Sequence, residues 1–186
     1  MNDLLDVESL AAAVRDGFRP KFLFFWSHQP QADGRIGKGC LSQWWPAVFE
    51  VDGVVYQTAE HYMMAEKARL FGDEAAREQI IAALHPGEAK KLGREVRGFD
   101  NEVWVQHRFD IVVRGNLAKF RQNEELKTFL LNSRSRVLVE ASPVDKIWGI
   151  GLAAEDVRAQ NPEEWQGLNL LGFGLMVVRE RLGTEA

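Results

Sequence analysis

The sequence of 186 residues lacks the features that mark secreted and membrane proteins. Cys40 is the single cysteine, so no disulfide can form within the chain, which is usual for proteins of reducing compartments. No apolar run approaches the roughly 20 residues that a membrane span needs. The first residues include Asp3, Asp6 and Glu8, whereas a secretory signal begins with basic residues and an unbroken apolar stretch. We therefore expect a soluble, cytoplasmic protein that does not bind a membrane.

The chain also lacks an excess of positive charge. It has 23 basic and 27 acidic residues, a formal net charge of -4 and a pI of about 5.6. Proteins that bind polynucleotides usually carry a basic stripe, so this balance argues mildly against a polynucleotide ligand. A small phosphate-bearing ligand needs only a few cations in one place. With 46% hydrophobic residues and this length, we expect one globular domain over residues 1–186.

Several catalytic and metal-binding signatures are absent from the sequence. There is no GxxxxGK(S/T) or GxGxxG phosphate-binding loop, no HExxH zinc motif and no GxSxG serine nucleophile. The four histidines, His28, His61, His85 and His107, do not have the spacing of metal ligands, and one cysteine cannot form a zinc cluster. We expect neither a metal nor another cofactor.

The front of the chain predicts one helix and a few short strands. Residues 4–16 alternate apolar and charged positions as an amphipathic helix does, and residues 21–27 are typical of a short buried strand. Residues 46–57 predict a hairpin, because Asp52-Gly53 suits a two-residue type I′ turn. The segments 29–39 and 153–167 are expected to be loops.

Most of the remaining chain predicts helices. Thr58, Asp73 and Asp100 are good helix N-caps, and Pro86 suits a first helical turn. Gly115 is expected to be a weak point inside its helix. A further strand is expected at 137–140, and the predicted helices span 58–71, 73–84, 86–94, 100–122, 123–132 and 168–182. The expected fold is mainly α, an α+β arrangement with a small β-hairpin near the N-terminus, because the strands are not interleaved with helices.

Glu60 and Lys67 form the first candidate functional group. Glu60 would lie in the first turn of its helix, where the helix dipole favours an ionised carboxylate. Lys67 follows seven residues later, on the same helix face two turns away. The pair could act on a charged substrate. The alternative is an ordinary first-turn acid and a solvated lysine, both of which are common.

The segment 142–151 forms the second candidate group. A loop with glycines lets the backbone approach a ligand closely. Trp148 could stack on a heterocycle, and Asp145 could bind ribose hydroxyls or position water. The alternative is a turn in which Asp145 caps locally while Trp148 fills the core.

Cations and aromatic residues supply two more candidate groups. Lys90 and Arg94 belong to a run of four cations that ends at Arg97 and could hold a phosphate; the alternative is a solvated helix end. Trp26 and Trp44 lie in aromatic segments that could clamp a base, or that could simply pack in the core.

Taken together, these segments resemble the YbiA-like family, also called NADAR. The resemblance covers roughly residues 20–182, and its specific parts are the segment from Glu60-His61-Tyr62 to Lys67 and the Asp-x-x-Trp-Gly-x-Gly segment at 145–151. The other matching stretches are 24–26, 41–44, 89–94, 115–120, 138–144 and 169–176. Residues 1–19 lie outside the match and are expected to form a helical extension.

The resemblance implies a single, mainly helical domain that cleaves the bond between a base-like nitrogen and ribose C1. It assigns the activity to Glu60, Asp145 and Trp148. By the same resemblance, Lys67, Lys90, Arg94 and Asn169 lie in or near the substrate pocket. The aromatic segments and the glycine loop add Trp26, Trp44, Gly149 and Gly151 as candidate substrate-binding residues. A carboxylate near C1 stabilises the positive charge of the ribose ring in such reactions and can deprotonate water; our hypothesis gives this role to Glu60 first and Asp145 second.

The family resemblance implies more than one substrate class. Early riboflavin-biosynthesis intermediates, which carry a phosphoribosyl group, are the first expectation. The alternatives are an ADP-ribosyl or NAD substrate, including ADP-ribosylated nucleic acid, and a non-catalytic sensor that binds such a nucleotide. Retention of both Glu60 and Asp145 argues against the sensor, because binding beside a phosphate does not need two carboxylates.

Overall fold

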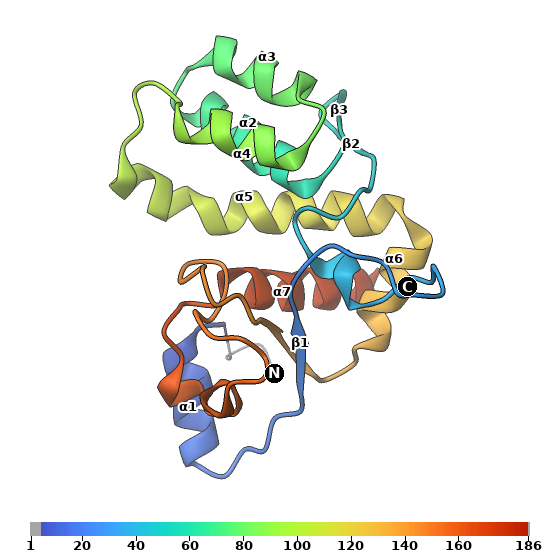
Figure 1. Cartoon of the computed structure of the whole chain (residues 1–186), viewed down its shortest axis with the longest axis vertical. Helices are drawn as coiled ribbons and strands as arrows, with labels where there is room; N and C mark the ends of the chain where they lie inside the picture. Colours follow the sequence, from blue (N-terminus) through green and yellow to red (C-terminus); the bar gives the residue numbers. More distant parts are fainter. Residues whose placement is uncertain (1–4, 186) are drawn as a thin grey trace. The chain divides into compact units, whose positions relative to one another are not determined.

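The computed structural model describes residues 5–185, which form two compact units (Figure 1). Unit 1 contains residues 5–42 and 128–185, and unit 2 contains residues 43–127. Each unit is described by itself below. The expected single domain over residues 1–186 stays a prediction.

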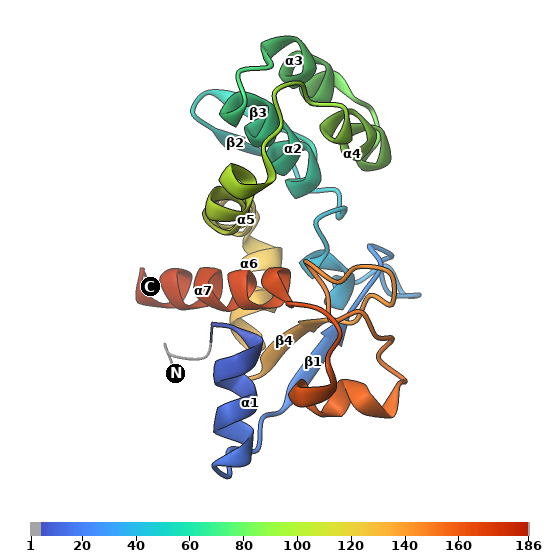
Figure 2. The same cartoon turned by 90° about the vertical axis from the view of Figure 1, so that its left-hand side faces the viewer.

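Unit 1 is built around two short parallel strands. Strand β1 (Phe22–Phe25) pairs with β4 (Val137–Glu140), so that Phe22 lies opposite Val137 and Phe25 opposite Glu140 (Figure 2). Helix α7 (Leu170–Thr184) packs against β4. At Gly172 a Cβ atom would lie 2.1 Å from the Leu138 carbonyl oxygen, so only glycine allows the helix to approach the strand this closely.

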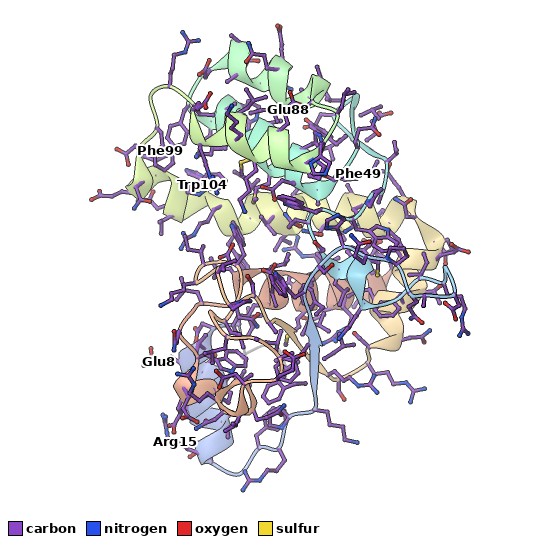
Figure 3. The ribbon with its side chains drawn as sticks, in the orientation of Figure 1. Glu8, Arg15, Phe49, Glu88, Phe99 and Trp104 are labelled. Carbon is purple, nitrogen blue, oxygen red and sulfur yellow. The ribbon has the colours of Figure 1, made fainter. Side chains whose placement is uncertain are left out.

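The N-terminal helix of unit 1 is α1 (Val7–Arg15), within the predicted range 4–16; residue 4 itself lies outside the described residues. Asp6 caps this helix by accepting a hydrogen bond from the Ser9 amide. Glu8 and Arg15 project from α1 in Figure 3, and Arg15 forms an ion pair with Glu163. The predicted loop 153–167 contains two short 3₁₀ helices, η2 (Val157–Gln160) and η3 (Pro162–Glu164). A third, η1 (Lys38–Leu41), begins within the last two residues of the predicted loop 29–39.

Unit 2 begins with the predicted hairpin, formed by β2 (Phe49–Val51) and β3 (Val54–Tyr56). Asp52 and Gly53 have φ angles of 52° and 77°. Both turn positions are therefore left-handed, as a type I′ turn requires, and the sequence prediction is confirmed.

The rest of unit 2 is helical, and the predicted caps hold. Thr58, Asp73 and Asp100 accept backbone hydrogen bonds at the starts of their helices. In Figure 1, α2, α3 and α4 gather on one side of the long helix α5. The helices are α2 (Ala59–Leu70), α3 (Glu74–Ala82), α4 (Pro86–Arg94) and α5 (Asn101–Gln122), and α6 (Glu124–Asn132) leads from unit 2 into unit 1.

Two glycines let these helices pack closely. A Cβ atom at Gly115 would lie 2.3 Å from the ring of Tyr62, and one at Gly93 would lie 2.1 Å from the sulfur of Met64. Gly115 therefore does not break α5. It provides the space for an aromatic ring of α2 against the neighbouring helix.

The mainly α fold class is confirmed, with three differences of detail. The strand expected over 21–27 ends at Phe25, and Ser27 has a φ of 71°, which ends the extended conformation. The strand at 137–140 pairs with β1, so unit 1 has a two-stranded sheet of its own in addition to the hairpin of unit 2. The last helix begins at Leu170, because Asn169 is left-handed with a φ of 51°. Within residues 5–185, no helix is long and apolar enough to cross a membrane.

Candidate functional site

The predicted site residues come from both units. Unit 2 carries Glu60 together with Trp44, Lys67, Lys90 and Arg94. Unit 1 carries Asp145, Trp148, Trp26, Gly149, Gly151 and Asn169. Their geometry is therefore described one unit at a time.

Glu60 is a deeply buried carboxylate, with only 2% of its surface exposed. It occupies the first turn of α2, where the helix dipole stabilises negative charge. Its own amide donates to the Gln43 carbonyl oxygen at 3.0 Å. A buried acid is unusual for a residue whose only role is to begin a helix, because burial of a charged group is costly.

A polar network around Gln43 supports this part of α2. The amide of Asn116 in α5 donates to Gln43 Oε1 at 2.7 Å and to the Val112 carbonyl oxygen at 2.9 Å. Gln43 and Asn116 are both buried, and no donor among residues 5–185 reaches Asn116 Oδ1. Both residues lie in stretches that match the family, 41–44 and 115–120, but neither was predicted to have a role. Their separation of 73 positions explains the omission, since no local spacing links them.

His61 completes the start of α2. Its Nε2 lies 3.1 Å from the Ala83 carbonyl oxygen, and its Nδ1 lies 2.8 Å from Thr58 Oγ1. A carbonyl only accepts, so the neutral ring carries its proton on Nε2 and accepts the Thr58 hydroxyl proton at Nδ1. Burial lowers the pKa of His61. The ring therefore acts as a neutral brace between α2 and the end of α3.

Lys67 lies at the other end of the same helix, about 10 Å from Glu60 along the axis. Its Nζ donates to the Gly93 carbonyl oxygen at 2.7 Å and lies 4.2 Å from the centre of the Phe99 ring. Figure 3 shows Phe99 and Trp104 at the start of α5. Burial, together with the positive charge of Arg94, lowers the pKa of Lys67. Lysine has three N–H donors, so two remain beyond the bond to Gly93.

Trp44, Lys90 and Arg94 lie around helix α4. Lys90 Nζ is 5.9 Å from the centre of the Trp44 ring, and the Trp44 and His85 rings meet edge to face at 5.7 Å. Lys90 and Arg94 are four residues apart and share one helix face. Unit 2 thus brings together the three predicted cations, Lys67, Lys90 and Arg94, around one helix.

Arg97, the fourth cation of the run, has a structural role. Its guanidinium donates to both carboxylate oxygens of Asp73, at 2.7 Å and 3.1 Å, and its amide donates to Asp73 at 2.9 Å. These bonds hold the pKa of the Asp73 carboxyl well below its usual range. Because Asp73 also caps α3, the pair ties the segment after α4 to the start of α3.

In unit 1, Trp26 and the 142–151 segment follow the same edge of the parallel pair. The amide of Ala141 donates to the Phe25 carbonyl oxygen at 2.9 Å, so the two strands end together. Trp26 is 52% exposed immediately after β1, and Trp148 is half-buried in the loop after β4. Residues that follow the carboxyl ends of parallel strands are well placed to form a ligand site.

Asp145 shapes the loop that carries Trp148. Its Oδ1 accepts hydrogen bonds from the amides of Ile147 and Trp148, both at 2.8 Å. This is the local cap that the sequence left open as an alternative. No hydrogen bond to Oδ2 is formed within residues 5–185, so one oxygen of this half-buried carboxylate remains available.

Gly149 and Gly151 serve the backbone of the same loop. A Cβ atom at Gly149 would lie 2.8 Å from the Glu140 carbonyl oxygen, and Gly151 has a φ of 69°. The amide of Gly151 donates to the Asp145 carbonyl oxygen, and the carbonyl oxygen of Gly149 accepts from Asn169. Both glycines are buried. They allow the loop to fold tightly against the end of β4.

Asn169 is fully buried and bonded through its whole side chain. Its Oδ1 accepts from the Glu140 amide at 2.9 Å, and its Nδ2 donates to the Leu138 carbonyl oxygen at 3.0 Å. Leu138 and Glu140 present these groups on the edge of β4 that does not face β1. The Asn169 amide therefore pairs with β4 as a peptide group of a neighbouring strand would.

The described residues contain no group of three or more histidine, cysteine, aspartate or glutamate side chains arranged to hold a metal ion. Unit 2 by itself provides a carboxylate, an aromatic ring and three cations, from Glu60, Trp44, Lys67, Lys90 and Arg94. Such a set suits binding of a phosphate-bearing compound with a planar ring and charge stabilisation at a nearby carbon.

Comparison with known proteins finds relatives over most of the chain. A family model described as the NADAR domain matches residues 24–183. An N-glycosidase of Acanthamoeba polyphaga mimivirus is 43% identical over 165 residues, which cover 86% of this chain and 95% of the relative. N-glycosidase YbiA of Escherichia coli is 33% identical over 141 residues, which cover 76% and 78% of the two chains. The NMR structure of the E. coli protein YbiA matches with a TM-score of 0.72 at 28% identity, and covers 90% of this chain and 88% of that one.

Proposed function

Because this chain belongs to the NADAR-domain family, in which several relatives are named N-glycosidases, we propose that it hydrolyses the N-glycosyl bond of a small, phosphate-bearing ribosyl compound. The protein is a hydrolase of N-glycosyl bonds, and the proposal concerns its substrate and its residues. The substrates that fit first are the phosphoribosyl intermediates of early riboflavin biosynthesis. The observation that carries this proposal is the buried Glu60 in the same unit as Lys67, Lys90 and Arg94.

Glu60 supplies the charge that the reaction needs. When the bond breaks, the base nitrogen leaves with the bonding electrons and positive charge develops on the ribose ring. A fixed carboxylate beside C1 stabilises this charge, and it accepts a proton from the water that adds to C1. Burial holds Glu60 in place and strengthens its field, because little water surrounds it.

The cations of unit 2 hold the phosphate. Lys67 keeps two N–H donors beyond its bond to Gly93, and Arg94 offers the planar guanidinium that matches a phosphate. Lys67 lies two helical turns from Glu60, so the carboxylate and the phosphate-binding group act at different parts of one substrate. Lys90, against the Trp44 ring, extends the same positively charged group.

We assign the loop of unit 1 a separate role. Asp145 fixes the turn through Oδ1, and the exposed part of Trp148 offers a ring surface for the base or the ribose. Asp145 Oδ2 accepts from a ribose hydroxyl or from water. This role is tested by its own substitutions, Asp145→Asn and Trp148→Leu, independently of Glu60.

Release of the base is the decisive measurement. The purified protein is incubated with the phosphoribosylamino-pyrimidine intermediates of riboflavin synthesis and, separately, with NAD, ADP-ribose and ADP-ribosylated DNA. We expect free ribose 5-phosphate from the pyrimidines, and a loss of about 10²- to 10⁴-fold in rate for Glu60→Gln. Release from the ADP-ribosyl substrates alone would reject the riboflavin intermediates.

A matched control separates catalysis from folding. Glu66 is a second buried carboxylate of α2, and it forms an ion pair with Arg69 at 3.0 Å. Glu66→Gln removes the same charge from the same helix, and we expect near-normal turnover once folding has been verified. If Glu60→Gln is folded and nearly as active as the wild type, Glu60 is not the catalytic carboxylate.

A further inference from the structure

A group of cations lies at the opposite edge of the parallel pair in unit 1. Lys21 directly precedes β1, and Arg134 and Arg136 directly precede β4. The amide of Val137 donates to the Lys21 carbonyl oxygen at 3.0 Å, so these two segments are neighbours. Trp26 and the Asp145 loop follow the other ends of the strands, about 10 Å away along β4.

These cations surround a cavity. Its lining consists of one lysine, two arginines, two serines and an asparagine: Lys21, Asn132, Ser133, Arg134, Ser135 and Arg136. Every lining side chain is a potential hydrogen-bond donor, and none is acidic. No carboxylate among residues 5–185 forms a salt bridge with any of the three cations, whereas Arg15, Arg35 and Arg158, three other exposed arginines of unit 1, each form one.

Arg179 of α7 binds the turn that lines the cavity. Its guanidinium donates to Ser133 Oγ at 2.7 Å and to the Arg136 carbonyl oxygen at 2.9 Å. Burial lowers the pKa of Arg179, although the negative charge of Glu180 acts in the opposite direction. The turn 133–136 is therefore held in place by a fourth cation.

The end of helix α6 does not account for these charges. Basic residues often follow a helix because they satisfy its last carbonyl groups. Here the Leu130 carbonyl oxygen already accepts from the amide and the hydroxyl of Ser133, and the Leu131 carbonyl oxygen accepts from the Arg134 amide. The Arg134 and Arg136 side chains are consequently not used as caps.

The backbone conformation of Arg134 is also consistent with a binding site. Arg134 has a φ of 53°, at the position after a helix where glycine is usual. A side chain in this conformation has an energetic cost, and such costs are often found at binding sites. Glycine would suit this backbone conformation better, so the local conformation does not explain an arginine at this position.

We propose that this cavity is a second, non-catalytic site that binds the phosphate groups of a small diphosphate ligand. Each arginine can form paired hydrogen bonds with one phosphoryl group, and Lys21 and the two serines supply further donors. Two arginines at alternate positions suit two adjacent phosphoryl groups. The net charge of -4 disfavours a polynucleotide as the ligand.

Calorimetric titration of the full chain with inorganic pyrophosphate, and separately with ADP, tests the site at physiological ionic strength. The first variant is Arg134→Gly, which removes the side chain and suits the left-handed backbone, so its melting temperature should equal or exceed that of the wild type. The second is Arg136→Gln. We expect each to weaken binding about tenfold to a hundredfold, while base release is unchanged. Arg181→Gln, an exposed arginine of α7, is the matched control and should bind as the wild type does.

The outcomes show whether the cavity binds a diphosphate and, if it does, whether it also recognises an attached nucleoside. Equal affinity for pyrophosphate and ADP indicates recognition of the diphosphate alone, and tighter binding of ADP adds a contact to the nucleoside; both support the site. Absence of binding, or unchanged affinity in Arg134→Gly and Arg136→Gln, overturns the proposal. Binding of an oligonucleotide without binding of either small ligand overturns it as well.

Discussion

Replacement of Asn169 by alanine is expected to destabilise the protein strongly. The substitution removes two hydrogen bonds and leaves the Glu140 amide and the Leu138 carbonyl without a partner at a buried strand edge. Each lost bond costs about 1 to 2 kcal/mol when its partner stays buried. Alanine also tolerates the φ of 51° less well than asparagine, which adds about 1 kcal/mol. The sum is about 3 to 5 kcal/mol in the free energy of unfolding.

Denaturant unfolding of a matched series measures this cost. Asn169→Gly loses the same bonds but accepts the left-handed backbone, so it should be about 1 kcal/mol more stable than Asn169→Ala. Asn101→Ala, at an exposed position of α5, is the control and should remain close to the wild type. An Asn169→Ala protein within about 1 kcal/mol of the wild type would refute the structural role. A raised KM at unchanged stability would instead indicate contact with the substrate.

Three further predictions concern unit 2. Gly115→Ala improves helix propensity by about 1 kcal/mol but overpacks against Tyr62 at a cost of about 1 to 3 kcal/mol. Thermal unfolding should therefore show a lower melting temperature than the wild type. A higher melting temperature would mean that the Tyr62 ring moves to make room. The pKa of His61 is lower in the folded protein than in the unfolded chain, so as the pH falls the unfolded chain takes up the proton first. Stability should therefore fall as the pH drops below 6.5. In His61→Gln, the melting temperature should depend less on pH over this range. Lys67→Gln should raise KM about tenfold for a phosphorylated substrate and leave KM for the dephosphorylated nucleoside nearly unchanged. Because the pKa of Lys67 is lowered, the wild-type KM for the phosphorylated substrate should begin to rise at a lower alkaline pH than the pKa of an ordinary lysine would predict.

Local chemistry made much of the fold predictable. The caps Thr58, Asp73 and Asp100 were correct because a cap depends on residues within three positions of it. The hairpin turn was correct because Asp-Gly meets a backbone requirement at two adjacent positions. Both signals act over short distances, so tertiary contacts had little opportunity to override them.

Long-range pairing was not predictable from the chain. Strands β1 and β4 are each four residues long, and more than a hundred positions separate them. Neither carries a signal that names its partner. The bond between Gln43 and Asn116 has the same difficulty, and it explains why the polar support of α2 near Glu60 was missed.

Matching motifs also cannot distinguish a residue that touches the substrate from one that builds the loop. Gly149 and Asn169 bond to each other's backbone, and the Asn169 side chain closes the free edge of β4. Glu60 is different, since the helix start does not require a buried carboxylate there and Thr58 already supplies the cap. A residue whose burial opposes its charge, at a position where the helix itself needs no acid, is the stronger candidate for chemistry. On this physical criterion Glu60 precedes Asp145, whose Oδ1 has a local structural task.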